Sequence, residues 1–352
     1  MDSPTLLLDT HIHLWREHEI QNLAWQSPEG PLFGVYDLEK YKSCISPIPP
    51  SYGGFIFVET DRKFTDPKDP SEDLTAWEHV LEEYRYLLQL SKNDKQGKQW
   101  VKGIVPFAPI HLGYEAMQRY KKQLEAVDTE VYGDEKHSLL VGFRYLVQDK
   151  PAGTASAPEF IEGLKFMRDN GLVFDLGIDM NRVGLVQFEE ALGALKQVDG
   201  LKIVINHLTK PPLGREPDNG GIEKWRSLME EIAKLDSTMK LSGGFSELPS
   251  GLARKNDDLP IDEIISMVLS YAKPIFTIFG PRRIIWGSDW PVCGIGYEQI
   301  MGEQKDAWHY WLKISKTIVS KMSQEEDIKG EPEDWEGIWG RNAIRAYNLP
   351  GF

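Results

Sequence analysis

Two histidines stand two positions apart near the start of the chain, in the run Asp9-Thr10-His11-Ile12-His13. In a β-strand, alternate side chains point to the same face, and their Cα atoms lie about 6.5–7 Å apart. His11 and His13 could therefore converge on one metal ion or on one substrate oxygen. A pair of hydrogen-bonded core histidines would give the same pattern, so the pair indicates a site only in combination with other residues.

Two further candidates follow apolar runs later in the chain. Asp289 stands in Trp286-Gly287-Ser288-Asp289-Trp290-Pro291, and His207 follows Ile203-Val204-Ile205-Asn206. We expect Asp289 to be a general base toward water or a metal ligand. We expect His207 to polarise a carbonyl group or to orient the water. The alternatives are a helix N-cap for Asp289 and an interior structural position for His207.

Charged and aromatic residues stand near the ends of other apolar runs. Arg144 and Lys210 could anchor hydroxyl or carboxylate groups of a substrate, and either could equally be half of a structural ion pair. Glu59 and Asp175 are candidate buried carboxylates, the first as a metal ligand and the second as a substrate ligand. Three tryptophans could wall a sugar-like substrate or pack in the core, namely Trp15, Trp25 and Trp290.

Eight apolar runs could bring these residues together. Most are nearly continuous in Val, Ile, Leu and Phe, as parallel strands covered on both faces are. The runs are Thr5–Leu14, Gly53–Thr60, Val101–Ile110, Leu139–Val147, Leu172–Ile178, Leu201–Leu208, Met239–Phe245 and Arg283–Trp290. Helical periodicity lies between them at Asp73–Ser91, Pro158–Asn170, Gly184–Val198, Ile222–Leu235 and Ile261–Phe279. This α/β alternation predicts a (β/α)8 barrel of the TIM type.

Ring closure decides whether the candidates form a site. The first and eighth strands are neighbours only in a closed barrel, whose catalytic groups lie at the C-terminal ends of the strands. A doubly wound open sheet is the alternative, but it would be expected to have a Gly-rich phosphate-binding loop after the first strand, where this chain has Asp9–His13. We expect one barrel domain, residues 1–352, with loops over its C-terminal face at Arg16–Pro50, Asp149–Pro158 and Lys210–Gly221.

Composition narrows the classes of partner. The chain has 40 Lys and Arg against 54 Asp and Glu, a formal charge of −14, which disfavours nucleic acid and membrane surfaces. Cys44 and Cys293 imply no disulfide framework, and no apolar stretch approaches the ~18–20 residues that span a bilayer. We expect a cytoplasmic protein with a small-molecule substrate. These features do not distinguish a monomer from a homo-oligomer.

The motifs taken together resemble the amidohydrolase superfamily, in the branch of metal-dependent hydrolases related to sugar-acid and aromatic-acid lactonases. The matching segments span almost the whole chain: Leu8-Asp9-Thr10-His11-Ile12-His13-Leu14-Trp15, Gly142-Phe143-Arg144, Ile205-Asn206-His207, Leu241-Ser242-Gly243, Trp286-Gly287-Ser288-Asp289-Trp290-Pro291 and Gly340-Arg341-Asn342-Ala343. The resemblance implies a distorted (β/α)8 barrel. It also implies hydrolysis of a lactone, such as an aldonolactone or a lactone derived from a uronic acid.

One departure from the superfamily pattern concerns the metal. Many members have a metal-binding His at the end of the fifth strand, where this chain reads Phe174-Asp175-Leu176-Gly177-Ile178, so a binuclear centre is not expected. The resemblance implies one divalent ion held by His11, His13 and Asp289 with Glu59, and His nitrogen with carboxylate favours zinc. Some lactonases of this branch need no metal, and the same residues then bind substrate directly.

The expected reaction is attack of a water on the lactone carbonyl, with Asp289 as base, His207 at the developing oxyanion, and Arg144 and Lys210 on the substrate. Two other readings compete with it. A metal-dependent decarboxylase or amide hydrolase of the same superfamily is the second, although the absent fifth-strand His disfavours the decarboxylase. A catalytically silent barrel that binds sugar or metal is the third.

Overall fold

The computed structural model describes residues 4–94, 100–133, 135, 138–214, 221–254 and 258–351. Eight strands lie within these residues, and each overlaps one of the predicted apolar runs. They are β1 (Leu7–Ile12), β2 (Tyr52–Val58), β3 (Val101–Val105), β4 (Gly142–Tyr145), β5 (Val173–Leu176), β6 (Ile203–Ile205), β7 (Ser237–Leu241) and β8 (Ile284–Trp286). All recorded strand pairings are parallel, in the orders β1-β2-β3 and β4-β5-β6-β7-β8.

Backbone hydrogen bonds join the two sheets at both seams and close the barrel. Between β3 and β4, the Ile104 N–H donates to Leu139 O (2.7 Å) and the Val141 N–H donates to Ile104 O (3.1 Å). Between the ends of β1 and β8, the Asp289 N–H donates to His11 O (2.9 Å). The chain therefore has the predicted (β/α)8 architecture, and residues near its two ends meet across the second seam.

That second seam is where the barrel is distorted. The segment Ile338–Trp339 lies between the two strands: the Leu8 N–H donates to Trp339 O (2.7 Å), and the Trp286 N–H donates to Ile338 O (3.0 Å). The Thr10 hydroxyl donates to Trp286 O (2.7 Å), and backbone hydrogen bonding across the seam resumes at His11 and Asp289. The strands are thus held apart lower down and meet at the level of the candidate site.

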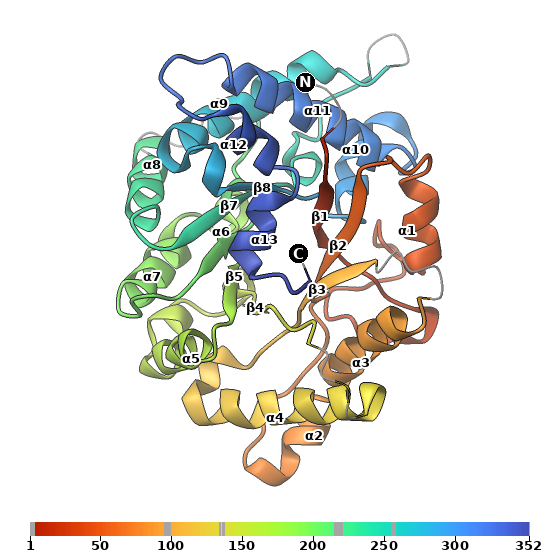
Figure 1. Ribbon diagram of the computed structural model, residues 1–352, viewed down its shortest axis with the longest axis vertical. Helices are drawn as coiled ribbons and strands as arrows, with labels where there is room; N and C mark the ends of the chain where they lie inside the picture. Colours follow the sequence, from red (N-terminus) through yellow and green to blue (C-terminus); the bar gives the residue numbers. More distant parts are fainter. Residues whose placement is uncertain are drawn as a thin grey trace.

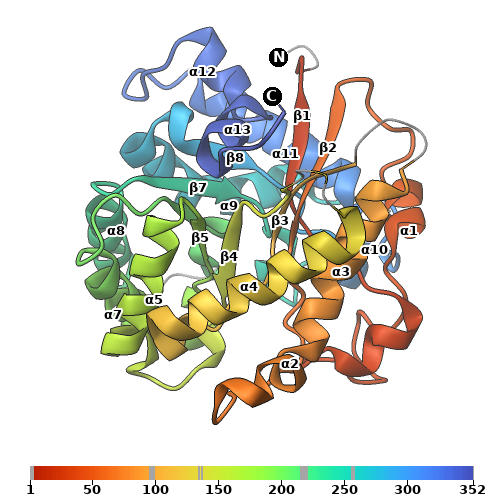
Figure 2. The same ribbon diagram turned by 60° about the horizontal axis from the view of Figure 1, so that its bottom comes forward.

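The helices surround the strands. They are α1 (Leu38–Cys44), α2 (Asp73–Ala76), α3 (Glu78–Lys92), α4 (Gly113–Tyr132), α5 (Pro158–Asp169), α6 (Met180–Val183), α7 (Val186–Leu195), α8 (Gly221–Ile232), α9 (Ile261–Phe279), α10 (Cys293–Met301), α11 (Ala307–Met322), α12 (Pro332–Gly337) and α13 (Arg341–Tyr347). Along the outside, α3, α4, α5, α7, α8, α9 and α11 each contact the next, and Figure 2 shows α3, α4 and α5 on one flank of this ring. All five predicted helices overlap observed ones, and the additions to them are α1, α4, α6, α10, α11, α12 and α13.

The last helix fills the base of the barrel. In Figure 1, α13 lies within the ring of strands. Its Ala343 and Tyr347, with Leu349 beyond it, pack against inward-facing residues of the strands, among them Leu8 and Val173. The interior is therefore a packed core below, and only its C-terminal end is open to substrate.

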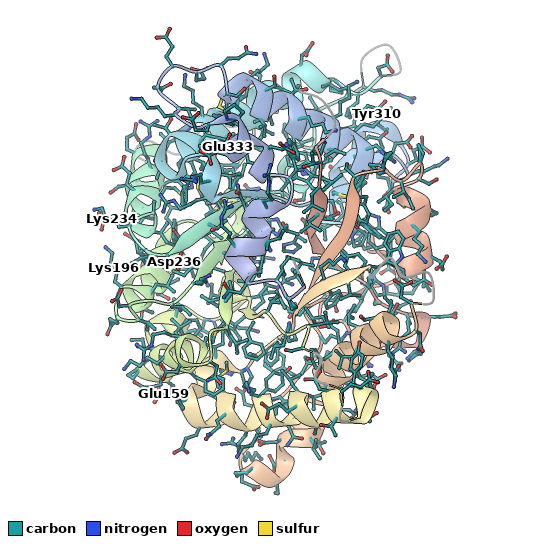
Figure 3. All side chains as sticks on the ribbon, in the orientation of Figure 1. Glu159, Lys196, Lys234, Asp236, Tyr310 and Glu333 are labelled. Carbon is teal, nitrogen blue, oxygen red and sulfur yellow. The ribbon has the colours of Figure 1, made fainter. Side chains whose placement is uncertain are left out.

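Charged side chains lie on the outside. Figure 3 shows Lys196, Lys234 and Glu333 projecting from the surface, and Lys196 Nζ donates to Glu231 Oε2 (2.7 Å) across the gap between α7 and α8. In the described part of the chain, no helix combines the length and apolar character needed to cross a membrane.

Candidate active site

The histidines of the first strand reach the barrel interior because β1 is irregular. The pairing of β1 with β2 shifts between Asp9 and Ile12, as a β-bulge would make it do. Leu8 packs in the inner apolar cluster, yet His11, an odd number of residues later, contacts Lys240 of β7. The rings of His11 and His13 lie 4.9 Å apart between centroids, so both face the same space.

Asp289 lies where the chain leaves β8, and the closed seam brings it to the histidines. Its Oδ1 lies 3.7, 3.5 and 3.8 Å from Nε2 of His11, His13 and His207, respectively. Its backbone is left-handed, with φ +63°, which costs on the order of 1–3 kcal/mol in a residue other than glycine. Because α10 begins at Cys293 without a side-chain cap, the N-cap alternative for Asp289 does not apply.

A short left-handed turn after β6 carries two of the predicted residues. His207, Leu208, Thr209 and Lys210 all have positive φ values, between 49° and 67°. Left-handed backbone costs roughly 1–2 kcal/mol per non-glycine residue, so the surroundings must hold this turn. Within the turn, the Lys210 N–H donates to His207 O (2.7 Å). From outside it, the Asn181 N–H donates to Lys210 O (3.0 Å). His207 and Lys210 consequently both line one cavity.

The second ring nitrogen of each histidine has a different partner. His13 Nδ1 lies 2.8 Å from the carbonyl oxygen of Val58, which only accepts, so Nδ1 carries the proton and the neutral ring keeps a lone pair on Nε2. His207 Nδ1 lies 2.8 Å from Ser242 Oγ, which can donate or accept. His11 Nδ1 lies 3.0 Å from Lys240 Nζ. The three imidazoles therefore do not offer the same chemistry to Asp289.

Burial sets the protonation of the cluster. Desolvation lowers the pKa of His207 to about 3 and that of His11 well below its ordinary value. Burial alone would raise the pKa of Asp289, but His207, His13 and Lys210 outweigh it and hold that pKa below its ordinary value. At neutral pH the site thus contains an ionised carboxylate with neutral His207 and His11. Asp289 Oδ2 is buried and has no hydrogen-bond partner, so it is available to accept a proton.

The cluster forms the floor of a cavity of about 580 Å³. Part of the lining is apolar and includes Trp15, Trp25, Leu32, Val292 and Ile295. The polar part includes Asp61, Arg144, Gln148, Arg182 and Lys210, of which Arg144 lies in β4 and Arg182 in α6. A cavity of this size with a few converging polar groups suits a small molecule that has one apolar and one hydroxylated side.

Four predicted residues do not line this cavity, and His11 is one of them, since it is fully buried beneath the floor. Glu59 accepts from Arg144 Nε (2.6 Å) through Oε1 and from the Asp61 N–H (2.5 Å) through Oε2, so its oxygens are engaged and a role as metal ligand does not fit. Asp175 is fully buried among Asn206, Lys240 and Tyr347, so it does not fit a substrate ligand. Trp290 packs against Tyr36 and Tyr41 and is 4% exposed, which makes it a core residue.

Sequence reasoning missed several residues of the site. Lys240 is the most consequential, because its ammonium group contacts both His11 and Asp175 (Nζ to Oδ2, 2.8 Å). Its signal was present, since it interrupts the otherwise apolar strand Met239–Leu241. Asp61, Gln148 and Arg182 were also missed, because they stand in a loop and in short helical turns whose positions no periodicity indicates.

The predicted metal site can be compared with the ligand atoms that the structure brings together. Within the described ranges, His11, His207 and Asp289 offer ligand atoms within 4.8 Å of one another, so a group with metal-binding potential is present. Metal-bound histidines almost always donate their other N–H to an acceptor, whereas His11 faces an ammonium group. Glu59 is engaged elsewhere, and His13 is not part of that 4.8 Å group. The four-ligand set predicted with Glu59 is therefore not assembled here, and His11, His207 and Asp289 are the residues that could hold an ion.

The chain is similar to known proteins both in sequence and in fold. A family model described as amidohydrolase matches residues 114–349. An L-rhamnono-gamma-lactonase of Scheffersomyces stipitis is 34% identical, with 97% of this chain and 98% of that protein aligned. An L-fucono-1,5-lactonase of Burkholderia multivorans is 26% identical over 60% of this chain and 64% of that protein. A crystal structure of an amidohydrolase from Burkholderia multivorans with bound zinc has a similar fold, with a TM-score of 0.71 at 19% identity, covering 98% of this chain and 100% of that one.

Proposed function

This chain belongs to the amidohydrolase family, and we propose that it is a hydrolase that opens the ester ring of a sugar-acid lactone. The observation that carries the proposal is the Asp289 carboxylate, which has one oxygen among three imidazoles and the other without a partner. Relatives named as lactonases of rhamnonate and fuconate support the substrate class. Decarboxylation and a silent barrel are less well supported, because neither explains the unengaged base.

Charge on the cavity wall favours a neutral aldonolactone over one that carries a further carboxylate. Arg144 pairs with Glu59 (2.6 Å). Lys210 and Arg182 both lie near Asp179 Oδ2, at 3.8 and 3.7 Å. Each of these cations already has a carboxylate partner, so they act as hydrogen-bond donors to hydroxyl groups more readily than as counter-ions. The apolar wall would receive an unsubstituted carbon of the sugar chain.

The mechanism assigns separate tasks to the residues of the floor. Asp289 Oδ2 and His13 Nε2 both accept, so a water that donates to both keeps a lone pair toward the carbonyl carbon. His207 takes its Nδ1 hydrogen bond from Ser242 and directs Nε2–H, with Lys210, to the carbonyl oxygen as it becomes an oxyanion. His13, whose Nδ1 proton is directed to Val58 O, has the task of an acceptor toward the water and not of a donor toward the carbonyl.

The proton balance is simple. Asp289 removes one proton from the water as its oxygen bonds to the carbonyl carbon. The tetrahedral intermediate then breaks the ring C–O bond, and Asp289 returns the proton to the leaving alkoxide. The products are a hydroxyl group and a carboxylic acid that ionises in solvent. Side chains of the chain itself carry out each of these steps, and the single zinc ion stays a prediction.

The decisive experiment is turnover of a panel of sugar lactones by the purified protein, before and after chelation, with elemental analysis of the same sample. We expect ring opening of neutral 6-deoxy aldonolactones that survives chelation. Dicarboxylate lactones should be poor substrates. Release of carbon dioxide from candidate acids without ring opening would favour the decarboxylase instead, and loss of turnover on chelation would restore the ion to the mechanism.

A further inference from the structure

We propose that Lys240 is a positioning residue that holds His11 in its Nε2–H form and thereby makes His11 a hydrogen-bond donor toward Asp289 instead of a metal ligand. The proposal rests on the proposed function only for its catalytic consequence. The contact itself is a feature of the buried core, and neither Lys240 nor its contacts were predicted from the sequence.

The geometry leaves one consistent arrangement of hydrogens. Lys240 is fully buried, and its Nζ lies 2.8 Å from Asp175 Oδ2 and 3.0 Å from His11 Nδ1. An ammonium group has donors and no acceptor, so the nitrogen of His11 that faces it must accept. In the neutral ring, the proton of His11 is then on Nε2, and Nε2 is the buried nitrogen that lacks a hydrogen-bond partner.

This tautomer suits the neighbouring carboxylate. His11 Nε2 lies 3.7 Å from Asp289 Oδ1. An N–H at that position attracts the carboxylate oxygen, whereas a lone pair there would repel it. Oδ1 is thereby drawn toward His11, and Oδ2 remains the oxygen that takes the proton from water. Lys240 thus acts on the base through His11, without touching substrate.

Asp175 and the C-terminal helix fix Lys240 in turn. Asp175 Oδ2 also accepts from the Tyr347 hydroxyl (2.5 Å), and its Oδ1 accepts from Asn206 Nδ2 (2.5 Å). A continuous set of hydrogen bonds therefore runs from α13 at the base of the barrel to His11 below the cavity. This gives the fully buried Asp175 a partner of opposite charge, because it holds the ammonium group of Lys240.

The first test uses the unmodified protein. Nitrogen-15 NMR of labelled histidines distinguishes protonated from unprotonated ring nitrogens, and a His11→Gln spectrum identifies the His11 signals by their loss. We expect an unprotonated Nδ1 and a protonated Nε2 for His11. A protonated Nδ1 would overturn the proposal, and this arm needs neither substrate nor a Lys240 variant.

The second test is Lys240→Met, which removes the donor at similar length. His11 Nε2 can then carry the lone pair, so zinc binding measured by calorimetry should tighten by at least about tenfold, while kcat on the best lactone falls by about 10–100-fold and KM changes little. Tyr84→Phe is the matched control, because it also removes a tyrosine hydroxyl that donates to a carboxylate, that of Asp128 (3.0 Å), but lies outside the network of Lys240. It should leave zinc affinity and the His11 spectrum unchanged.

The NMR and zinc measurements test the role of Lys240, whereas turnover of lactones tests the proposed function. A folded Lys240→Met protein that binds zinc no more tightly than the unmodified protein would refute the role of Lys240. If Lys240→Met does not fold, the spectrum of the unmodified protein decides. If no lactone is turned over by any sample, the proposed function fails, and the NMR and zinc measurements still decide whether Lys240 sets the tautomer of His11.

Discussion

At the scale of single residues, the two oxygens of Asp289 have different surroundings and so different tasks. Oδ1 lies within 3.8 Å of all three imidazole Nε2 atoms, whereas Oδ2 has no partner. A buried acceptor without a partner is costly, on the order of 1–3 kcal/mol, and such costs are usually retained where a ligand or a transferred proton uses the group. The carboxylate therefore has the placement that a general base for water requires.

Asp289→Asn tests the base directly. The amide keeps the size of the side chain but cannot accept the proton, so turnover should fall by about 10²- to 10⁴-fold, the usual contribution of general-base catalysis. The measurement is kcat on the best lactone of the panel, with thermal unfolding to show that the fold is intact. Asp66→Asn is the control, since Asp66 also contacts a histidine, His111 (2.8 Å), but does not line the cavity.

The pH dependence of the reaction follows from the same groups. The base must be ionised, and the pKa of Asp289 is held below its ordinary value by His207, His13 and Lys210 despite its burial. Activity should therefore be lost only as the pH falls through that lowered pKa. Because desolvation lowers the pKa of His207 to about 3, protonation of His207 should not reduce kcat/KM between about pH 5 and 8, where an unperturbed His would titrate near 6.5. An inflection at pH 6–7 that disappears in His207→Gln, after correction for spontaneous hydrolysis, would contradict this assignment.

At the scale of elements, irregular backbone at three strand ends aims the functional side chains. The bulge in β1 turns His11 inward, the left-handed turn after β6 presents His207 and Lys210 together, and Asp289 leaves β8 with φ +63°. Regular strands would alternate inward and outward residues without interruption. Strain of this kind persists only where surrounding contacts over-determine the conformation. One of these contacts is the close packing of Gly243 against the ring of His207.

Gly243→Ala should disturb that approach. A Cβ at Gly243 would lie 2.8 Å from His207 Nδ1, and the residue has φ +68°. We expect His207 to be displaced, kcat to fall at least about tenfold, because roughly 1 Å of misplacement can cost 10²-fold, and stability to fall by about 1–3 kcal/mol. Gly184→Ala isolates the backbone cost, since Gly184 has φ +73° with nothing within 4 Å of the added carbon. Equal losses of kcat in the two variants would show that the contact with His207 is unimportant.

At the scale of the whole molecule, both ends of the chain complete the barrel. The first strand meets the chain beyond β8 at the site, Ile338–Trp339 fills the lower part of the same seam, and α13 covers the base of the interior. The site therefore depends on residues far from it in sequence and at the opposite end of the barrel.

Removal of residues 341–352 should consequently prevent stable folding. It exposes inward-facing apolar residues such as Leu8 and Val173 and removes the Tyr347 donor to Asp175. We expect an aggregated protein, or one without a cooperative thermal transition by circular dichroism. Removal of residues 350–352 alone should leave the transition nearly unchanged, because Pro350 and Gly351 are exposed. A cooperative transition in the longer truncation would show that α13 is dispensable.

The sequence by itself determined the local structure and most of the reactive residues. Apolar runs and helical periodicity depend on near neighbours, so the eight strands, the barrel class and the bounds Ile261–Phe279 of α9 could be predicted. Residue type at strand ends likewise indicated His11, His13, His207 and Asp289, because barrels place their chemistry there. The assignments of Glu59, Asp175 and Trp290 failed for one reason, namely that each depends on partners that the sequence does not identify.

Only the tertiary structure decided how those residues work together. The contact of Lys240 with His11 joins positions 229 apart in the chain, and which nitrogen of His11 holds the proton depends on that contact alone. Packing between distant segments also produces the inward turn of β1 and the left-handed turn at His207. It likewise pairs Arg144 and Lys210 of the cavity with carboxylates. Residue types and local spacing do not encode such contacts, because hydrogen-bond partners are fixed only when the ring of strands closes.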